Sequence, residues 1–427
     1  MTLLLLGVVF VMLLVLGVPI AFTMGVAAVI AIFLTGTVPL LLIPGRMVAA
    51  SDSFVLLAIP FFILAGTLME MSGIAHRLLT LARALVAHLR GGLGMAVVVA
   101  EMFFSGISGS TVADVSAISS MLLPSMQRAG YARPHSVAII SAASAMGILI
   151  PPCINMIILG ELMSLSVAAL FFAGFLPAAV LAVLIMGLVY VQARRLDVAR
   201  EDRATWREFL RAASGAAVPL GLPVIMFGGI LGGVFTPTEA GAVAVLYVLV
   251  FGVAVYRTIT VRDLWHALLD TGVNTGVIML LIGAASVLSY LLAVQHLPQI
   301  IVRAIAGVSS GPWFFLLVTS LVFVFIGSLL EGIPAMMIFV PIFLPVVEEL
   351  GINPLHYGIV VIAAVGIGLF VPPAGVGLIV GCAVGQVSID KVSRGMVPFL
   401  LVLLLGLGIL IFVPTITTVV PAALGVR

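Results

Sequence analysis

The stretch GILIPPCINMIILG, residues 147–160, carries two consecutive prolines in the middle of an apolar segment. A proline has no N–H donor and clashes with the preceding turn, so a helix cannot continue unbroken through Pro151 and Pro152. The stretch GIGLFVPPAGVGL, residues 366–378, has the same double proline 221 positions later. Two breaks of one kind at a fixed separation predict a chain that contains the same structural unit twice.

Further glycines and prolines are related by the same separation of 221 positions. These two residue types fix backbone geometry, so their recurrence indicates a repeated backbone. Internal repeats are typical of secondary transporters, where the two halves are often inverted in the membrane. The matched pairs are Gly106 with Gly327, Pro124 with Pro345, Gly130 with Gly351, Gly147 with Gly368, Pro151 with Pro372, Pro152 with Pro373, Gly174 with Gly395 and Pro177 with Pro398.

The composition places the repeats in a lipid bilayer. Of the 427 residues, 63% are hydrophobic and 8% are charged, which is far from the composition of soluble domains. The first segment, MTLLLLGVVFVMLLVLGVPIAF, lacks a basic start and a small-residue cleavage site, so we expect a retained membrane helix. The net charge of +2 and the scattered basic residues do not indicate nucleic-acid binding. Cys153 and Cys382 lie in apolar sequence and are expected to be buried.

Segments that can cross a bilayer occur five times in each half of the chain. We therefore predict an all-α polytopic membrane protein with a first repeat over 1–191, a linker over 192–212 and a second repeat over 213–427. The predicted crossings are 2–19, 21–36, 54–72, the broken helix 136–157 and 167–190, followed by 215–235, 239–256, 273–293, the broken helix 358–381 and 395–417.

Two more apolar stretches, 93–126 and 312–347, are interrupted midway by GISGSTVAD and GSLLEGIP. Each could form two crossings or one re-entrant helical hairpin, and charge does not separate these alternatives because either returns the chain to the same side. Length favours hairpins, since each arm has about twelve to sixteen residues where a crossing needs about 20.

The distribution of basic residues predicts the orientation. Fifteen of the eighteen Lys and Arg residues fall on one side of the predicted topology, which identifies that side as the cytoplasm. Both termini are then periplasmic. The odd number of crossings in each half makes the second repeat inverted, and 192–212 becomes a cytoplasmic linker for which we expect a solvated amphipathic helix.

Each interrupted stretch, paired with a broken helix, is a candidate ion site. Non-helical backbone at membrane depth is tolerated only where it is buried in protein or lines a polar cavity. The tip Ser105–Thr111 and the break Gly147–Asn155 together offer hydroxyl and freed carbonyl oxygens, which suit a hard cation such as sodium. The duplication predicts a second site around 327–334 and 368–377. Helix N-termini at the tips favour anions, so a carboxylate could be held between them.

Three acids, Asp114, Glu101 and Glu331, lie within the predicted membrane span, where ionisable groups are costly and usually functional. Asp114 could brace the first tip or bind an ion, and Glu331 could bind a cation or carry protons. Glu101 and Glu70 are expected to be interfacial or paired. The sequence has no nucleotide loop, no metal spacing among its histidines and no nucleophile–base motif, so we expect a transporter that uses an ion gradient and not an enzyme.

These segments resemble the large membrane subunit of TRAP transporters, the DctM type, over essentially the whole chain. The likeness rests on AIPFFILAGTLME at 58–70, FFSGISGSTVADVSAI at 103–118, GILIPPCINMIILG at 147–160, GGVFTPTEAGAVAVLY at 232–247, IPAMMIFVPIFLPVV at 333–347 and GIGLFVPPAGVGL at 366–378. The resemblance implies the ion-transporter superfamily fold, an elevator mechanism and uptake of a small organic acid across the bacterial inner membrane. It also implies two partners, which are a small four-helix membrane subunit and a periplasmic substrate-binding protein.

The resemblance further implies particular ligands for Na+, largely backbone carbonyls. Val371 and Cys153 depart from the family pattern, which usually has a hydroxyl side chain at each position, so the second site could be lined by carbonyls alone. The first sodium site would comprise Ser105, Ser108, Gly147, Ile150 and Pro152, and the second Gly327, Gly368, Val371 and Ala374. The residues predicted to hold the substrate are Ser108, Ser110, Thr111, Asn155 and Gly375.

Other functions are less consistent with the sequence. A stand-alone sodium- or proton-coupled carboxylate carrier of the same superfamily would share these features without needing a binding protein. A passive channel is disfavoured because duplicated broken helices suit an occluding carrier. An intramembrane enzyme would need a base near Ser108 or Asp114, and neither has a neighbouring His or Lys. The substrate itself is not identified, since many organic acids share a carboxylate.

Overall fold

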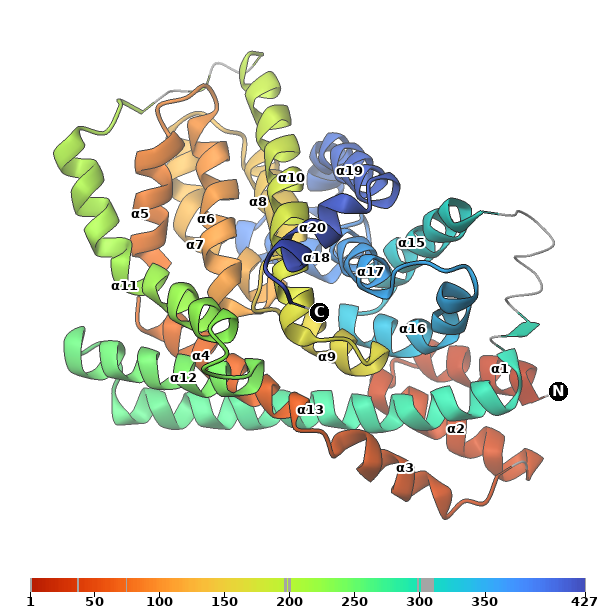
Figure 1. Ribbon diagram of the computed structural model, residues 1–427. Helices are drawn as coiled ribbons and strands as arrows, with labels where there is room; N and C mark the ends of the chain where they lie inside the picture. Colours follow the sequence, from red (N-terminus) through yellow and green to blue (C-terminus); the bar gives the residue numbers. More distant parts are fainter. Residues whose placement is uncertain are drawn as a thin grey trace.

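The computed structural model describes residues 2–36, 38–73, 75–195, 198, 201–297, 299–300 and 311–426, and these residues form helices and connecting turns without a β-strand (Figure 1). The helices of the first half are α1 (Thr2–Val15), α2 (Ile20–Thr35), α3 (Leu42–Ser51), α4 (Ala58–Met71), α5 (Ala75–Val86), α6 (Gly92–Ser108), α7 (Thr111–Arg128), α8 (Arg133–Gly147), α9 (Ile154–Met163) and α10 (Val167–Ala193). Those of the second half are α11 (Trp206–Leu231), α12 (Pro237–Leu249, continued by a π-helical turn over Val250–Val255), α13 (Val261–Val294), α15 (Pro312–Leu329), α16 (Gly332–Glu349), α17 (Pro354–Gly368), α18 (Val376–Gly385), α19 (Ile389–Phe412) and α20 (Thr415–Ala423).

The chain is a multi-pass membrane protein. Among the described residues, seven helices are long and apolar enough to span a bilayer, and an eighth span is possible if α3 and the Val55–Met71 segment, bent by 63°, count as one. The predicted crossings at 136–157 and 358–381 are each two helices separated at the double proline, which are α8 with α9 and α17 with α18. Cys153 and Cys382 are buried, as expected.

Two predictions about helix continuity are wrong. The helix predicted over 395–417 ends at Phe412, because Pro414 cannot donate a backbone hydrogen bond, and α20 begins separately at Thr415. The linker 192–212 is not one amphipathic helix: α10 ends at Ala193, α11 begins at Trp206, and the described residues between them are not helical. A capping box between Thr205 and Glu208 fixes the start of α11, which is why the helix does not extend further back.

Helices in the two halves have matching bounds. Both ends of α7 and α16, and both ends of α8 and α17, are separated by 221 positions, as are the last residues of α6 and α15. The arms of the interrupted stretches are longer than the sequence indicated, with 17 residues in α6 and 18 in each of α7, α15 and α16. Two of these arms, α15 and α16, are both long and apolar enough to span a membrane. The length of the arms therefore does not distinguish a re-entrant hairpin from two crossings, and the expectation of short arms is wrong.

The helices form two groups in Figure 1. The 34-residue helix α13 lies along one side of the molecule and contacts α2, α3 and α4, while α12 packs on α4. We call α1–α4 and α11–α13 the scaffold group. The other group comprises α6–α10 and α15–α20. Its two central helices are α8 and α17, in which every residue from Ser136 to Gly147 and from His356 to Gly368 is buried. Small residues in α8 and α17 permit this close packing, and both helices end where their prolines break them.

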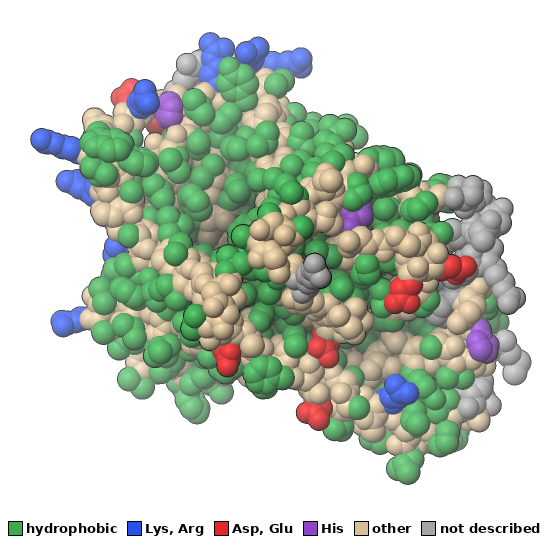
Figure 2. Space-filling view, viewed as in Figure 1, with side chains coloured by type: hydrophobic (Ala, Val, Ile, Leu, Met, Phe, Trp, Pro, Cys, Tyr) green, Lys and Arg blue, Asp and Glu red, His purple; other side chains and the backbone are tan. Residues whose placement is uncertain are grey.

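The surface fits a protein embedded in lipid. Figure 2 shows hydrophobic side chains over the middle of the visible face, with most of its Lys and Arg side chains along the upper and left margins. One of the basic residues, Arg83 on α5, forms an ion pair with Glu201 in the linker, and this contact holds the linker against α5.

Candidate functional site

The first tip is a tight turn between α6 and α7. Gly109 ends α6 with φ +66°, a left-handed conformation that glycine adopts without steric cost, and Ser110 is extended at the start of α7. The backbone N–H of Ser110 donates to the Ser108 hydroxyl at 3.2 Å, so Ser108 supports the turn from within. The polar cluster predicted from the sequence is therefore a compact turn with its serines on the last turn of α6.

The first tip lies directly against the first break. A Cβ at Gly106 would be 3.2 Å from the Pro151 carbonyl oxygen, and one at Gly109 would be 3.4 Å from the Pro152 carbonyl oxygen. Gly147 faces Ser105 so closely that a Cβ there would overlap its hydroxyl. The structure thus gathers four of the five residues of the predicted first sodium site, and Ile150 lies beside them, because its Cγ2 would be 3.4 Å from a Cβ on Gly106.

Two buried acids lie next to the serines of the first tip. The Ser105 hydroxyl lies 2.6 Å from Asp114 Oδ2 and 3.2 Å from Glu101 Oε1, and the Ser108 hydroxyl donates to Asp114 Oδ1. Asp114 is 1% exposed and Glu101 is 0% exposed. Asp114 therefore joins the end of α6 to the first turn of α7. This is the bracing geometry that the sequence offered as one of two alternatives. Glu101 lies against the same Ser105 hydroxyl through Oε1, while its Oε2 has no hydrogen-bond partner among the described residues.

The second tip and break approach each other through backbone alone. A Cβ at Gly368 would be 2.6 Å from the Val324 carbonyl oxygen and 3.0 Å from the Gly327 Cα. Val371 donates its N–H to the Gly368 carbonyl at 3.0 Å. Ser328, which follows Gly327 in the chain, donates its hydroxyl at 2.7 Å to the Phe325 carbonyl of its own helix. The predicted second site thus brings Gly327, Gly368 and Val371 together, and Ala374 lies in the turn in which the Gly375 N–H donates to the Val371 carbonyl at 2.9 Å.

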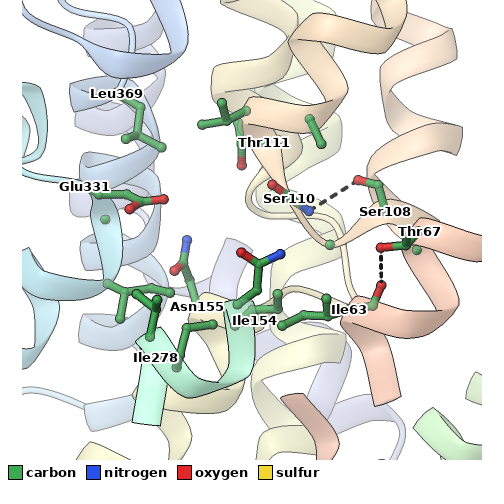
Figure 3. A pocket seen from close by; sticks show the side chains of 18 of the residues that line it. Ile63, Thr67, Ser108, Ser110, Thr111, Ile154, Asn155, Ile278, Glu331 and Leu369 are labelled. Carbon is green, nitrogen blue, oxygen red and sulfur yellow. Dashed lines mark hydrogen bonds between the residues drawn. The ribbon is translucent and has the colours of Figure 1, made fainter. Parts of the chain in front are cut away.

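A cavity of about 300 Å³ lies between the two tips (Figure 3). Four of the five residues predicted to hold substrate line it, namely Ser108, Ser110, Thr111 and Asn155. Asn155 also reaches the second tip, because its Nδ2 would be 3.5 Å from a Cβ on Gly332. Gly375 does not line this cavity. It packs on the backbone of its own break, near the carbonyl carbon of Leu369 and the Val371 nitrogen.

Scaffold helices close the other side of the cavity, and their place there was not predicted from the sequence. Thr67 and Glu70 of α4 and Asn274 of α13 line the cavity together with the tips. Gly66 permits this contact, since a Cβ there would be 2.6 Å from the Ser108 carbonyl oxygen. Glu70 was expected to be interfacial or paired, whereas the only signal for Asn274 was a lone amide in an apolar segment.

The architecture is that of a polytopic helical membrane protein with two broken helices and two helical tips around one cavity. A family model described as "Tripartite ATP-independent periplasmic transporter, DctM component" matches residues 6–416. The chain belongs to this family of transporter permeases, as the sequence motifs indicated.

Individual relatives agree with this assignment. The chain is 40% identical to the ectoine/5-hydroxyectoine TRAP transporter large permease protein UehC of Ruegeria pomeroyi, over 87% of each chain. It is 37% identical to the C4-dicarboxylate TRAP transporter large permease protein DctM of Pseudomonas aeruginosa, over 89% of each chain. Its fold is similar to that of the Alcanivorax borkumensis YdaH transporter, with a TM-score of 0.63 and 16% identity over 87% of this chain and 86% of that one.

Proposed function

We propose that this chain is the substrate-translocating subunit of a TRAP transporter that takes up a small organic acid across the bacterial inner membrane, driven by a sodium gradient. The relatives described above are named for a C4-dicarboxylate and for ectoine, both small organic acids. The observation that carries the proposal is the cavity of about 300 Å³, which is lined by both tips and by the scaffold helices α4 and α13. A cavity between two helix groups is where a carrier can hold a small solute while one group moves.

Sodium coupling is supported by the oxygen-rich contact between the first tip and the first break. Serine hydroxyls and the carbonyls of Pro151 and Pro152 converge there, next to the buried carboxylate of Asp114. Hard cations favour such oxygen ligands. The first site would hold Na+ through Ser105, Ser108, Gly147, Ile150 and Pro152, whereas the second would use carbonyls around Gly327 and Gly368, with Val371 and Ala374 completing the predicted set.

An elevator mechanism with two inverted repeats is supported by the matching bounds of α7 with α16 and of α8 with α17. Two backbone units with matching helix bounds, placed around one cavity, suit alternating access, in which α6–α10 and α15–α20 would carry the substrate past the scaffold group. In this topology both tips are re-entrant, the linker 192–212 is cytoplasmic and both termini are periplasmic.

The identity of the partner proteins is inferred from the family. A periplasmic binding protein would deliver the organic acid, and a small four-helix membrane subunit would stand beside the scaffold group in the bilayer.

Uptake by proteoliposomes that contain both membrane subunits, with the binding protein added outside, tests the proposal. We expect accumulation of the organic acid when an inward sodium gradient is imposed and none when sodium is absent. Undiminished uptake driven by a proton gradient alone would contradict sodium coupling. Full uptake without the binding protein would support a stand-alone carrier instead.

A further inference from the structure

A second cavity, of about 250 Å³, lies between the same two groups of helices as the cavity between the tips. The scaffold group lines it through α3, the turn at Leu56 and α13, and the other group lines it through α9 and α16. The described residues that line this second cavity include none from the tips at 105–111 and 327–334. It is therefore separate from the candidate substrate site, although it lies in the same interface.

One face of α13 lines both cavities. The residues of α13 at the cavity between the tips are Asn274, Val277, Ile278 and Leu281. Those at the second cavity are Ile282, Ala285, Ser286 and Ser289. All eight belong to a single stripe, in which residues three and four positions apart lie on the same side of the helix. Each residue of the second set follows its counterpart in the first by eight positions, which corresponds to about 12 Å along the helix axis.

The helices that face α13 pass from one cavity to the other in the same sense. On α9, Ile154 lines the cavity between the tips, and Ile158, one turn further on, lines the second cavity. On α16, Ile333 lines the first cavity, and Met337, again one turn further on, lines the second. The helix α16 packs on both α9 and α13, and α9 and α16 lie on one side of α13 (Figure 1). The tips thus occupy one of two similar positions along α13.

The second position has polar groups of its own. Ser286 and Ser289 are the only polar side chains of α13 between Thr275 and Tyr290, and both line the second cavity, where each is half-buried. Polar side chains at membrane depth are costly and usually face a cavity or a partner. One other polar residue among the described residues lines this cavity, Glu161, and it belongs to α9 and not to the scaffold group. The scaffold therefore offers two hydroxyls at a place that the tips do not now reach.

We propose that the second cavity marks the position of the substrate site in the alternate state of the transport cycle. Movement of the tips, α9 and α16 by about 12 Å toward the C-terminal end of α13 would bring Ser286 and Ser289 opposite the tips, where Ile278 and Leu281 lie now. The two hydroxyls would then replace the Asn274 amide as the scaffold groups that hydrogen-bond to the organic acid. This inference rests on the proposed function and specifies the length of the movement, its direction and the second set of substrate contacts.

Cross-linking between cysteines on α13 and α16 tests this register. Ile333→Cys is combined in turn with Ile278→Cys, Ser286→Cys or Val294→Cys, in a background whose two native cysteines are replaced by alanine. The complex of both membrane subunits in nanodiscs is treated with a short bis-thiosulfonate reagent, and bridged peptides are quantified by mass spectrometry. We expect a product with positions 278 and 286. Position 294 is the matched control and should give none, because it lies a further eight residues, about 12 Å, along the helix.

A product with position 278 and none with 286 would overturn the inference, because α16 would then not reach the second cavity. Equal products with 286 and 294 would overturn it as well, since the movement would then have no defined second position. The cross-links require neither a sodium gradient nor the binding protein. Sodium-driven uptake is measured separately, so the proposed function can stand where this inference fails.

The role of the two hydroxyls has its own test. Ser286→Ala combined with Ser289→Ala should lower sodium-driven uptake about tenfold, because a substrate in the second position loses its hydrogen bonds to the scaffold. Threonine at both positions keeps the hydroxyls and should restore most of the uptake. Ser214→Ala is the control, since Ser214 is exposed on α11 and donates to the Arg211 carbonyl of its own helix. Normal uptake by the double alanine variant would overturn the assignment of the hydroxyls to the substrate.

Discussion

The Ser105 hydroxyl donates a hydrogen bond to Asp114 across the first tip, with 2.6 Å between Oγ and Oδ2. The Ser108 hydroxyl donates to the other oxygen of the same carboxylate. One buried acid thus fixes the orientation of two hydroxyls that the proposed ion site would use. Bonds of this kind, from neutral donors to a charged acceptor, contribute about 1.5–3 kcal/mol each.

Asp114→Asn should therefore lower sodium-dependent uptake about tenfold or more, because an amide has one acceptor oxygen where the carboxylate has two. The measurement is the initial uptake rate and the apparent sodium constant in proteoliposomes, at matched protein amounts. Asp270→Asn is the control, since Asp270 is exposed on α13 and does not line the cavity. A normal rate and sodium constant for the Asp114 variant would show that the carboxylate has no role at the ion site.

Ser108→Ala should weaken the apparent affinity for sodium roughly ten- to hundredfold, because a hydroxyl is lost from a dehydrated site. Ser108 also lines the cavity, so the apparent affinity for substrate should fall as well. Ser116, half-buried further along α7 and outside the cavity lining, provides the comparison. Equal and near-normal uptake by Ser108→Ala and Ser116→Ala would place the first ion site elsewhere.

The sequence predicted the parts of the site that depend on backbone geometry. Gly109 and the double prolines have direct local consequences, so the tip and the break were found where Ser105–Thr111 and Gly147–Asn155 indicated. Their proximity was predicted from the hydroxyl and carbonyl oxygens that the tip and the break offer together, and the close approach of Gly147 to Ser105 agrees with it.

The contribution of the scaffold to the cavity was not predicted. Thr67 of α4 and Asn274 of α13 lie about 200 positions apart in the chain, and their convergence depends on packing between helices, for which local sequence carries no signal. The same limit applies to Gly375, which was predicted to hold substrate, whereas the structure packs it on its own break.

Gly66→Ala should impair transport by forcing α4 away from the first tip. A Cβ at Gly66 would lie 2.6 Å from the Ser108 carbonyl oxygen, a backbone atom that cannot rotate aside. Overpacking of this kind costs about 1–3 kcal/mol, so we expect the uptake rate to fall about tenfold. Gly276→Ala on α13 serves as the control, because no atom lies within 4 Å of its added Cβ. Comparable uptake by the two variants would mean that α4 does not contact the tip during transport.

Gly368→Ala should destabilise the protein as well as reduce transport, since its Cβ would lie 2.6 Å from the Val324 carbonyl oxygen and 3.0 Å from the Gly327 Cα. We expect a lower midpoint of thermal unfolding for the purified complex, with a cost of about 1–3 kcal/mol. Gly408→Ala on α19 has open space around the added methyl group and should leave the midpoint unchanged. An unchanged midpoint for Gly368→Ala would contradict the close approach of α15 and α17.

The central claim is that the cavity between the tips is carried across the membrane by movement of one helix group against the scaffold. Cysteines at Ile278 of α13 and Ile333 of α16, which both line the cavity, can be bridged by a short reducible bis-thiosulfonate reagent in a background where Cys153 and Cys382 are replaced by alanine. A second pair, at Met47 of α3 and Gly283 of α13, lies within the scaffold group, where a Cβ on Gly283 would be 3.3 Å from the Met47 Cβ.

Sodium-driven uptake before bridging, after bridging and after reduction of both pairs is the decisive measurement. We predict that bridging the cysteines at positions 278 and 333 abolishes uptake and that reduction restores it. Bridging the cysteines at positions 47 and 283 should leave uptake intact. Full uptake by a protein bridged between Ile278 and Ile333 would contradict it, because the two helix groups would then not need to move apart.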